Sequence, residues 1–196
     1  AFIRGYSNAS VTVTATGKNG ASIASYIINN GGRTATTARA TFNGVTSESF
    51  VVTVTDSRGV SATKSVLVNM IDYTKVTCVV AATPPNTDGE TTITVSGKYF
   101  NRALGNTANT LVIEYRRWRH GDGSNDNWMT ITPTTNQGSY WVDLPLDDLD
   151  YKSAYTFEAR ATDLLSTANS SVQLKTIPVF SWSNDDFEFN VDTNIN

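Results

Sequence analysis

Apolar and polar residues alternate along most of this chain. The clearest run is 155–162, in which apolar and polar residues take alternate positions. Successive side chains of a strand point to opposite faces, so this alternation predicts a strand with one buried face. Further strands are predicted at 10–16, 23–28, 34–42, 48–55, 60–71, 76–82, 91–99, 111–119, 128–132, 139–144 and 171–176. No long run has the apolar spacing of a helix, so the fold class we predict is all-β.

Glycine and asparagine clusters separate these strands. The NNGG sequence at 29–32 predicts a hairpin turn, because consecutive Asn and Gly accept positive φ at little cost. The DSRG sequence at 56–59 predicts a second hairpin, which joins 48–55 to 60–71. We expect a polar loop at 100–109, a long hairpin loop at 120–127 and a turn at 164–169.

The chain of 196 residues is long enough for two domains of ordinary size. We predict two tandem β-sandwiches, at 1–72 and 76–177, followed by an extended connector at 178–196. The sequence starts at Ala1 without a methionine and stops soon after a strand-like run, so we expect it to be part of a longer protein.

The second domain carries a spacing that resembles fibronectin type III domains. Apolar Leu149 stands six positions before Tyr155, which opens the strand at 155–162. In fibronectin type III domains this spacing marks the passage from strand E to strand F, where the tyrosine hydroxyl binds nearby backbone. The resemblance implies a seven-stranded sandwich, but many functions share that fold.

The first domain resembles the immunoglobulin-like modules found along siphophage tails. The resemblance rests on GASIASY at 20–26, NGV at 43–45 and FVVTVTDSRGVSATKSVLV at 50–68, of which TVTDSRG is the most telling. We count about six strands there, and the missing strand lies upstream or in segment 1–6. The pattern W-x-x-x-D-F-x-F-N-V at 182–191 is similar to a segment that follows fibronectin-like modules in minor tail proteins of siphophages infecting Gram-positive bacteria.

Composition limits the function only loosely. A net charge of −3 argues against a nucleic-acid binder, and the longest apolar runs are too short to span a membrane. The single cysteine, Cys78, excludes an internal disulfide and is expected to be a small buried apolar group.

We expect no catalytic site, no cofactor and no metal. The only histidine, His120, lies in a polar loop beside Asp122, where a solvated side chain is the simpler interpretation than a general base. Oxygen-rich clusters at 122–127, 147–150 and 183–186 lack the order of a calcium-binding loop, so we favour solvated loops there.

Aromatic and arginine residues form the candidate face for a ligand or partner. It consists of Trp118, Trp128, Arg117, Arg119 and Trp141. An exposed tryptophan can stack on a sugar ring or anchor a protein interface, and arginines can meet phosphate. The alternatives are that Trp118 and Trp128 simply pair on the sheet surface, or that arginine stacks on them without any ligand.

By resemblance, we predict a spacer and adhesion module of a phage tail or baseplate. Its partners would be other tail or baseplate proteins and a host cell-wall polysaccharide. The alternatives are a bacterial surface adhesin or stalk module, and an accessory carbohydrate-binding module of a secreted glycan hydrolase. Localisation would be the virion tail or the bacterial cell surface. Phe187, Phe189 and Val191 would suit pairing with another chain, as in a trimer, or would cover the end of the second sandwich.

Overall fold

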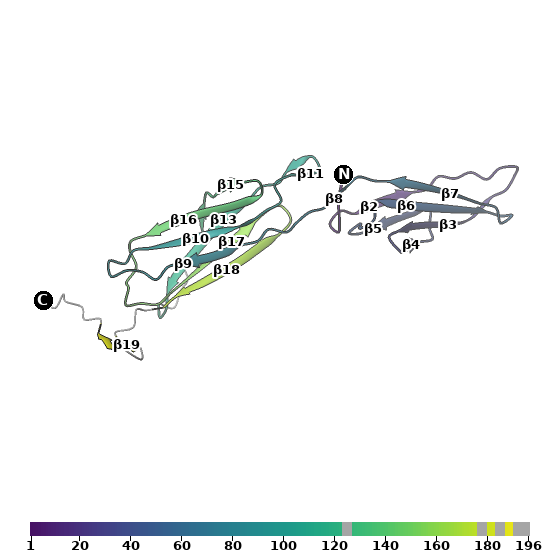
Figure 1. Ribbon diagram of the computed structural model, residues 1–196. Coiled ribbons are helices and arrows are strands. Elements are labelled where there is room, and N and C mark those ends of the chain that lie inside the picture. Colours follow the sequence, from purple (N-terminus) through teal and green to yellow (C-terminus); the bar gives the residue numbers. More distant parts are fainter. Residues whose placement is uncertain (123–126, 176–179, 183–186, 190–196) are drawn as a thin grey trace. The chain divides into compact units, whose positions relative to one another are not determined.

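Every regular element that the structure describes is a β-strand. The computed structural model describes residues 1–122, 127–175, 180–182 and 187–189 (Figure 1). The prediction of an all-β protein built from sandwiches is therefore confirmed. Its residues divide into two compact units, 1–74 with 102–108, and 75–101 with 109–196, and we describe each by itself. The residue boundaries expected from the sequence remain predictions.

Residues 1–74 of the first unit contain one sheet of four strands and two pairs of strands. The four-stranded sheet has the order β4 (Arg33–Ala35), β3 (Ile23–Asn30), β6 (Ser49–Asp56) and β7 (Ser61–Leu67). The pairs are antiparallel β2 (Ala9–Thr12) with β5 (Arg39–Phe42), and parallel β1 (Phe2–Ile3) with β8 (Met70–Ile71). Segment 1–6 thus supplies a strand. A small core from both layers contains Ala9, Ile28, Phe42, Val45 and Phe50.

Both predicted hairpins of the first unit are present. Gly31 and Gly32 have φ of 56° and 83°, as a tight turn between β3 and β4 requires. The second hairpin is closed by Asp56, whose Oδ1 accepts hydrogen bonds from the backbone N–H groups of Arg58 (2.9 Å) and Val60 (3.0 Å). These bonds lower the pKa of the Asp56 carboxyl, with Val60 as the largest cause. The sequence DSRG therefore fixes the connection from β6 to β7.

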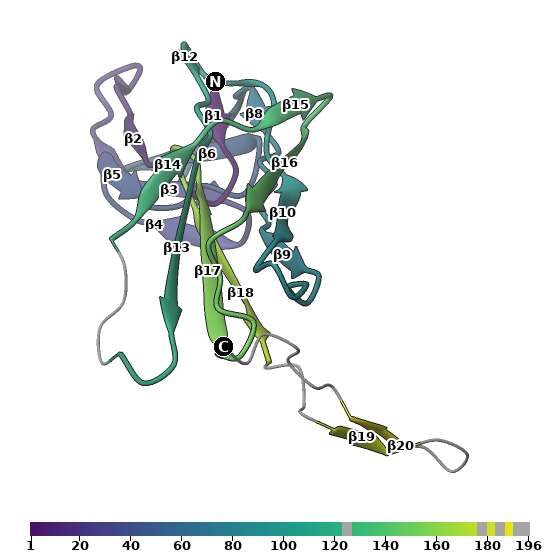
Figure 2. The ribbon, with the colours of Figure 1, turned by 90° about the vertical axis from the view of Figure 1, so that its left-hand side faces the viewer.

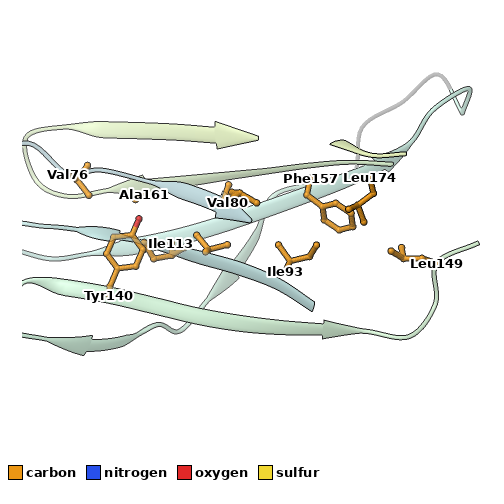
Figure 3. Close-up of a cluster of buried hydrophobic side chains, with 11 residues drawn as sticks. Val76, Val80, Ile93, Ile113, Tyr140, Leu149, Phe157, Ala161 and Leu174 are labelled. Carbon is orange, nitrogen blue, oxygen red and sulfur yellow. The ribbon is translucent and has the colours of Figure 1, made fainter. Parts of the chain in front are cut away.

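The second unit is a sandwich of two four-stranded sheets. One has the order β15 (Thr134–Asn136), β16 (Ser139–Leu146), β10 (Thr91–Lys98) and β9 (Val79–Ala82). The other has the order β14 (Met129–Ile131), β13 (Val112–Arg119), β17 (Tyr155–Thr162) and β18 (Thr167–Leu174). Their inner faces share one core, shown in part in Figure 3, which contains Val76, Val80, Ile93, Val95, Ile113, Tyr140, Leu149, Phe157, Ala159, Ala161 and Leu174.

The corner before β17 has the predicted tyrosine arrangement. Leu149 is buried in the core, and the Tyr155 hydroxyl accepts a hydrogen bond of 3.0 Å from the backbone N–H of Asp150. The spacing of six residues lets the tyrosine reach back across the turn. The predicted hydrogen bond of the tyrosine to nearby backbone is confirmed.

Two expected loops are partly regular structure. Segment 100–109 contains a short hairpin, β11 (Ala103–Leu104) with β12 (Thr107–Ala108), in which Gly105 has a φ of 71°. The turn expected at 164–169 is shorter, because β18 already begins at Thr167. Asp163 tightens that turn, since its Oδ1 accepts hydrogen bonds of 2.9 Å from the N–H groups of Leu165 and Ser166.

Two short strands follow the second sandwich in sequence. β19 (Phe180–Trp182) pairs antiparallel with β20 (Phe187–Phe189), and Figure 2 shows this hairpin. Pairing within the chain provides a partner for the strand containing Phe187 and Phe189, which we had considered available to another chain. Val191 and the oxygen-rich cluster at 183–186 lie outside the described residues.

Candidate functional site

The outer face of β13 is organised around arginine and tryptophan. Ile113 lies fully buried in the core, so the residues at even positions of β13 face outward. Arg116 and Trp118 are therefore on the outer face, where the neighbouring strand places Glu158 opposite Arg116 and Thr156 opposite Trp118. Alternation along β13 therefore places Arg116, and neither Arg117 nor Arg119, on the same face as Trp118.

Two guanidinium groups lie over the Trp128 ring. The Cζ atom of Arg160 is 4.2 Å from the ring centroid, and that of Arg116 is 4.6 Å from it. Arg116 also lies 5.5 Å from the ring centroid of Trp118. We call Trp118, Trp128, Arg116 and Arg160 the Trp–Arg stack. Each such cation–π contact contributes about 0.5–2 kcal/mol, depending on how far the pair is removed from water.

Carboxylates of the same face hold both arginines in place. Arg116 donates from Nε to Glu158 over 2.7 Å, and Arg160 donates from Nε to Glu114 over 2.6 Å. The hydrogen bond from Arg160 lowers the pKa of the Glu114 carboxyl, and the same bond raises the pKa of Arg160. Both tryptophans are only partly exposed. The stack therefore satisfies its own charges and leaves little aromatic surface for a ligand.

Arg117 and Arg119 point to the other side of β13. Arg117 forms a two-pronged ion pair with Asp148: its Nη1 donates to Oδ1 over 2.6 Å, and its Nη2 donates to Oδ2. Arg119 is 3.2 Å from Asp150. The Arg117 guanidinium lowers the pKa of the Asp148 carboxyl. The structure therefore separates these two arginines from Trp118, although the sequence places them beside it.

Trp141 lies on the opposite sheet from the Trp–Arg stack. It belongs to the outer face of β16, where its register partners are Ser96 of β10 and Thr134 of β15. Its exposed fraction is 41%. Trp141 is thus the exposed one of the three tryptophans in the candidate face. It lies on a different sheet from Trp118, Arg117 and Arg119.

His120 and Cys78 have different surroundings. His120 lies at the end of β13, and its Nε2 is 2.7 Å from the hydroxyl oxygen of Thr156, a residue of the outer face. His120 is otherwise exposed, as expected for a solvated side chain. Cys78 is half-buried, and burial raises the pKa of its thiol, which keeps it protonated at neutral pH. Neither environment matches that of an activated base or nucleophile.

Two of the three carboxylates at 147–150, Asp148 and Asp150, are used within the protein. Asp148 pairs with Arg117, while Asp150 accepts hydrogen bonds from the Lys152 N–H (2.9 Å) and the Ser153 hydroxyl (2.6 Å). Within the described ranges, no group of three or more His, Cys, Asp and Glu side chains is placed to hold a metal ion. The cluster at 122–127 lies mostly outside those ranges.

The comparisons with known proteins include a weak structural match to immunoglobulin domains. No protein-family model and no curated protein sequence matches this chain. A solved structure of immunoglobulin domains, Dpr2 Ig1–Ig2 in complex with DIP-Theta Ig1–Ig3, matches with 12% identity and a TM-score of 0.35. The match covers 90% of this chain and 61% of that chain. A TM-score this low carries no argument about function. In the described residues, no helix is long and apolar enough to cross a membrane.

The candidate face from the sequence omitted Arg160, Glu114 and Glu158. Alternation from buried Ile113 would have placed Arg116 rather than Arg117 beside Trp118. The cross-strand partners on β17 depend on the register between strands more than forty residues apart, as with Arg116 and Glu158. No local pattern in the sequence encodes that register.

Proposed function

We propose that this chain is a spacer and adhesion module of a phage tail or baseplate, and that its role is not enzymatic. Its partners are other tail or baseplate proteins and host cell-wall polysaccharide, and its location is the virion tail. The observation that carries the proposal most is the hairpin at TVTDSRG. It is the most telling part of the resemblance to siphophage tail modules, and Asp56 closes it with three contacts.

The two sandwich units suit a mechanical role. Each has its own buried core, drawn from both of its layers. In the second unit, the ion pairs Arg116–Glu158 and Arg160–Glu114 cross directly from β13 to β17. Such cross-strand pairs hold neighbouring strands in register. A module of this kind keeps its shape while it separates a recognition element from the tail.

Adhesion in this proposal is weak per module and strong in the assembly. Phage tails present several copies of a module, and multivalent attachment exceeds the affinity of one site without any new contact. The alternatives, a bacterial adhesin or stalk and an accessory module of a glycan hydrolase, would use the same sandwich architecture. They differ from the proposal in where the protein is found.

Immunogold electron microscopy tests the proposal. Antibodies raised against this chain would be applied to cells and to induced phage particles of the bacterium that encodes it. Label on particle tails is the expected result. Label on the cell surface alone would identify an adhesin or stalk. If the antibodies instead detect secreted protein with glycan-hydrolase activity and label no phage particles, the chain is the accessory module.

A further inference from the structure

The outer face of the sheet that contains Trp141 leads into a hollow. In order along β16, outward-facing Trp141, Asp143 and Pro145 stand opposite Ser96, Thr94 and Thr92 of β10. The hollow lies at the end of this strip, has a volume of about 680 Å³ and is open to solvent. Its lining includes Thr83, Asn86, Glu90, Thr92, Pro145 and Asp147. All of these residues belong to the second unit.

The chemistry of the strip differs at its two ends. The Trp141 ring is exposed, and its register partners Ser96 and Thr134 have small hydroxyl side chains. The face of the ring is therefore free to stack on a flat apolar surface of a ligand. Four strand residues further on, about 13 Å away, the hollow is lined by hydroxyl groups, an amide and carboxylates, together with two prolines and a leucine. Its amide, that of Asn86, donates a hydrogen bond of 2.9 Å to one oxygen of Glu90. Asp143, between the two, accepts a hydrogen bond of 2.6 Å from Thr94.

We infer that this strip, from Trp141 to the hollow at Asn86, Glu90 and Asp147, is a binding site for a neutral oligosaccharide. The inference rests on the proposed function and names the ligand class of its adhesive part. The C–H face of a sugar ring stacks on Trp141, and sugar hydroxyls donate to the carboxylates of the hollow. A ligand that is apolar on its ring faces and rich in hydroxyls at its edges matches both ends of the strip.

Charge excludes the anionic wall polymers from this strip. Glu90, Asp143 and Asp147 give it three carboxylates, and Lys98, one row beyond Trp141, is the cation nearest in register. A phosphate-rich polymer would be repelled along most of its length. Arg117 and Arg119, which the sequence offered for phosphate, are paired with Asp148 and Asp150.

Nuclear magnetic resonance of the indole N–H groups tests the site. The whole chain has four tryptophans, whose signals can be assigned with single Trp→Phe variants. The probes are chitotetraose, a solubilised neutral polysaccharide from Gram-positive walls, and poly(glycerol phosphate). We expect saturable shifts at Trp141 and at the amides of Thr92 and Thr94 with a neutral probe, and none with the phosphate polymer.

Two variants make the result specific. Trp141 is exposed, so the Trp141→Ala variant should fold normally. Its affinity for the neutral probe should be at least about tenfold lower than that of the wild type. Asp147→Asn should weaken binding severalfold and leave the Trp141 ring in place. Trp118→Ala serves as the control and should bind as well as the wild type, provided that its spectrum shows a folded protein.

Each other outcome overturns the inference. Shifts confined to Trp118 and Trp128, or shifts at Trp141 with the phosphate polymer, would retain wall adhesion and contradict this site. No shift with either neutral probe would also contradict it. In that case immunogold label on phage tails would still support the spacer role, so the two proposals fail separately.

Discussion

The guanidinium of Arg160 lies over the ring of Trp128, with its Cζ atom 4.2 Å from the ring centroid. Arg160 comes from β17 and Trp128 from the segment leading into β14, and these strands flank β13 on opposite sides. The contact therefore reaches across three strands. Trp128 therefore has a structural role in the sheet, whereas the sequence predicted it to be part of a ligand-binding face.

Replacing Trp128 by alanine should destabilise the second unit. The change removes two cation–π contacts and a half-buried ring, so we expect a loss of about 1–3 kcal/mol in the free energy of unfolding. Urea denaturation followed by circular dichroism measures it. Trp141→Ala is the matched control and should change stability by less than about 0.5 kcal/mol, because that ring is exposed. Equal losses in the two variants would contradict the structural role of Trp128.

The tyrosine corner gives a second prediction. Tyr155→Phe leaves the backbone N–H of Asp150 without its acceptor, and should cost about 0.5–1.5 kcal/mol of stability. Tyr115→Phe is the control, since it removes a hydroxyl from a core-packed tyrosine that has no hydrogen bond to the described residues. Chemical denaturation of both variants gives the comparison. A Tyr155→Phe protein as stable as the wild type would show that the corner bond contributes nothing.

Gly97 should not tolerate a side chain. A Cβ at this position would lie 2.0 Å from the Thr77 carbonyl oxygen and 2.7 Å from the buried Tyr140 ring. Tyr140 cannot move away easily, because its hydroxyl donates a 2.7 Å hydrogen bond to that same carbonyl. We expect Gly97→Ala to cost about 1–3 kcal/mol. Thermal unfolding of this variant, compared with the neighbouring Ser96→Ala control, measures the loss. A neutral effect would mean that Gly97 is packed less closely against Thr77 and Tyr140 than described.

Asp56 predicts a pH dependence for the first unit. Hydrogen bonds from Val60 and Arg58 lower the pKa of its carboxyl in the folded state. A lowered pKa means that the stabilisation is complete above the unfolded pKa of about 3.9 and is lost as the pH falls through the folded value. The wild type should be more stable than Asp56→Asn at neutral pH, and the difference should vanish in acid. A difference that stays constant with pH, measured by urea denaturation, would contradict this account.

Local spacing in the sequence was sufficient to predict the elements whose geometry depends on only a few neighbouring residues. The six-residue spacing from Leu149 to Tyr155 and the DSRG turn each encode their own geometry, because their hydrogen bonds join residues close in sequence. The β11–β12 hairpin around Gly105 could also have been found from its Gly-Asn pair. It was missed because each strand has only two residues.

The candidate site was predicted less well, for two reasons. Grouping Arg117 and Arg119 with Trp118 ignored the alternation that puts them on opposite sides of β13. Placing Trp141 with Trp118 ignored that the two strands belong to different sheets. The partners Glu158 and Arg160 depend on long-range register, which only the folded sheet defines.

The adhesive claim is tested most directly by binding to cells. The chain would be displayed in a multivalent format and incubated with whole Gram-positive bacteria, alongside Trp141→Ala and the double variant Trp118→Ala, Trp128→Ala. The account predicts saturable binding by the wild type and by any folded double variant, and loss of binding by Trp141→Ala. No binding by the folded wild type to any strain would contradict the adhesive role and leave a spacer. Loss of binding by the folded double variant alone would return the site to the Trp–Arg stack.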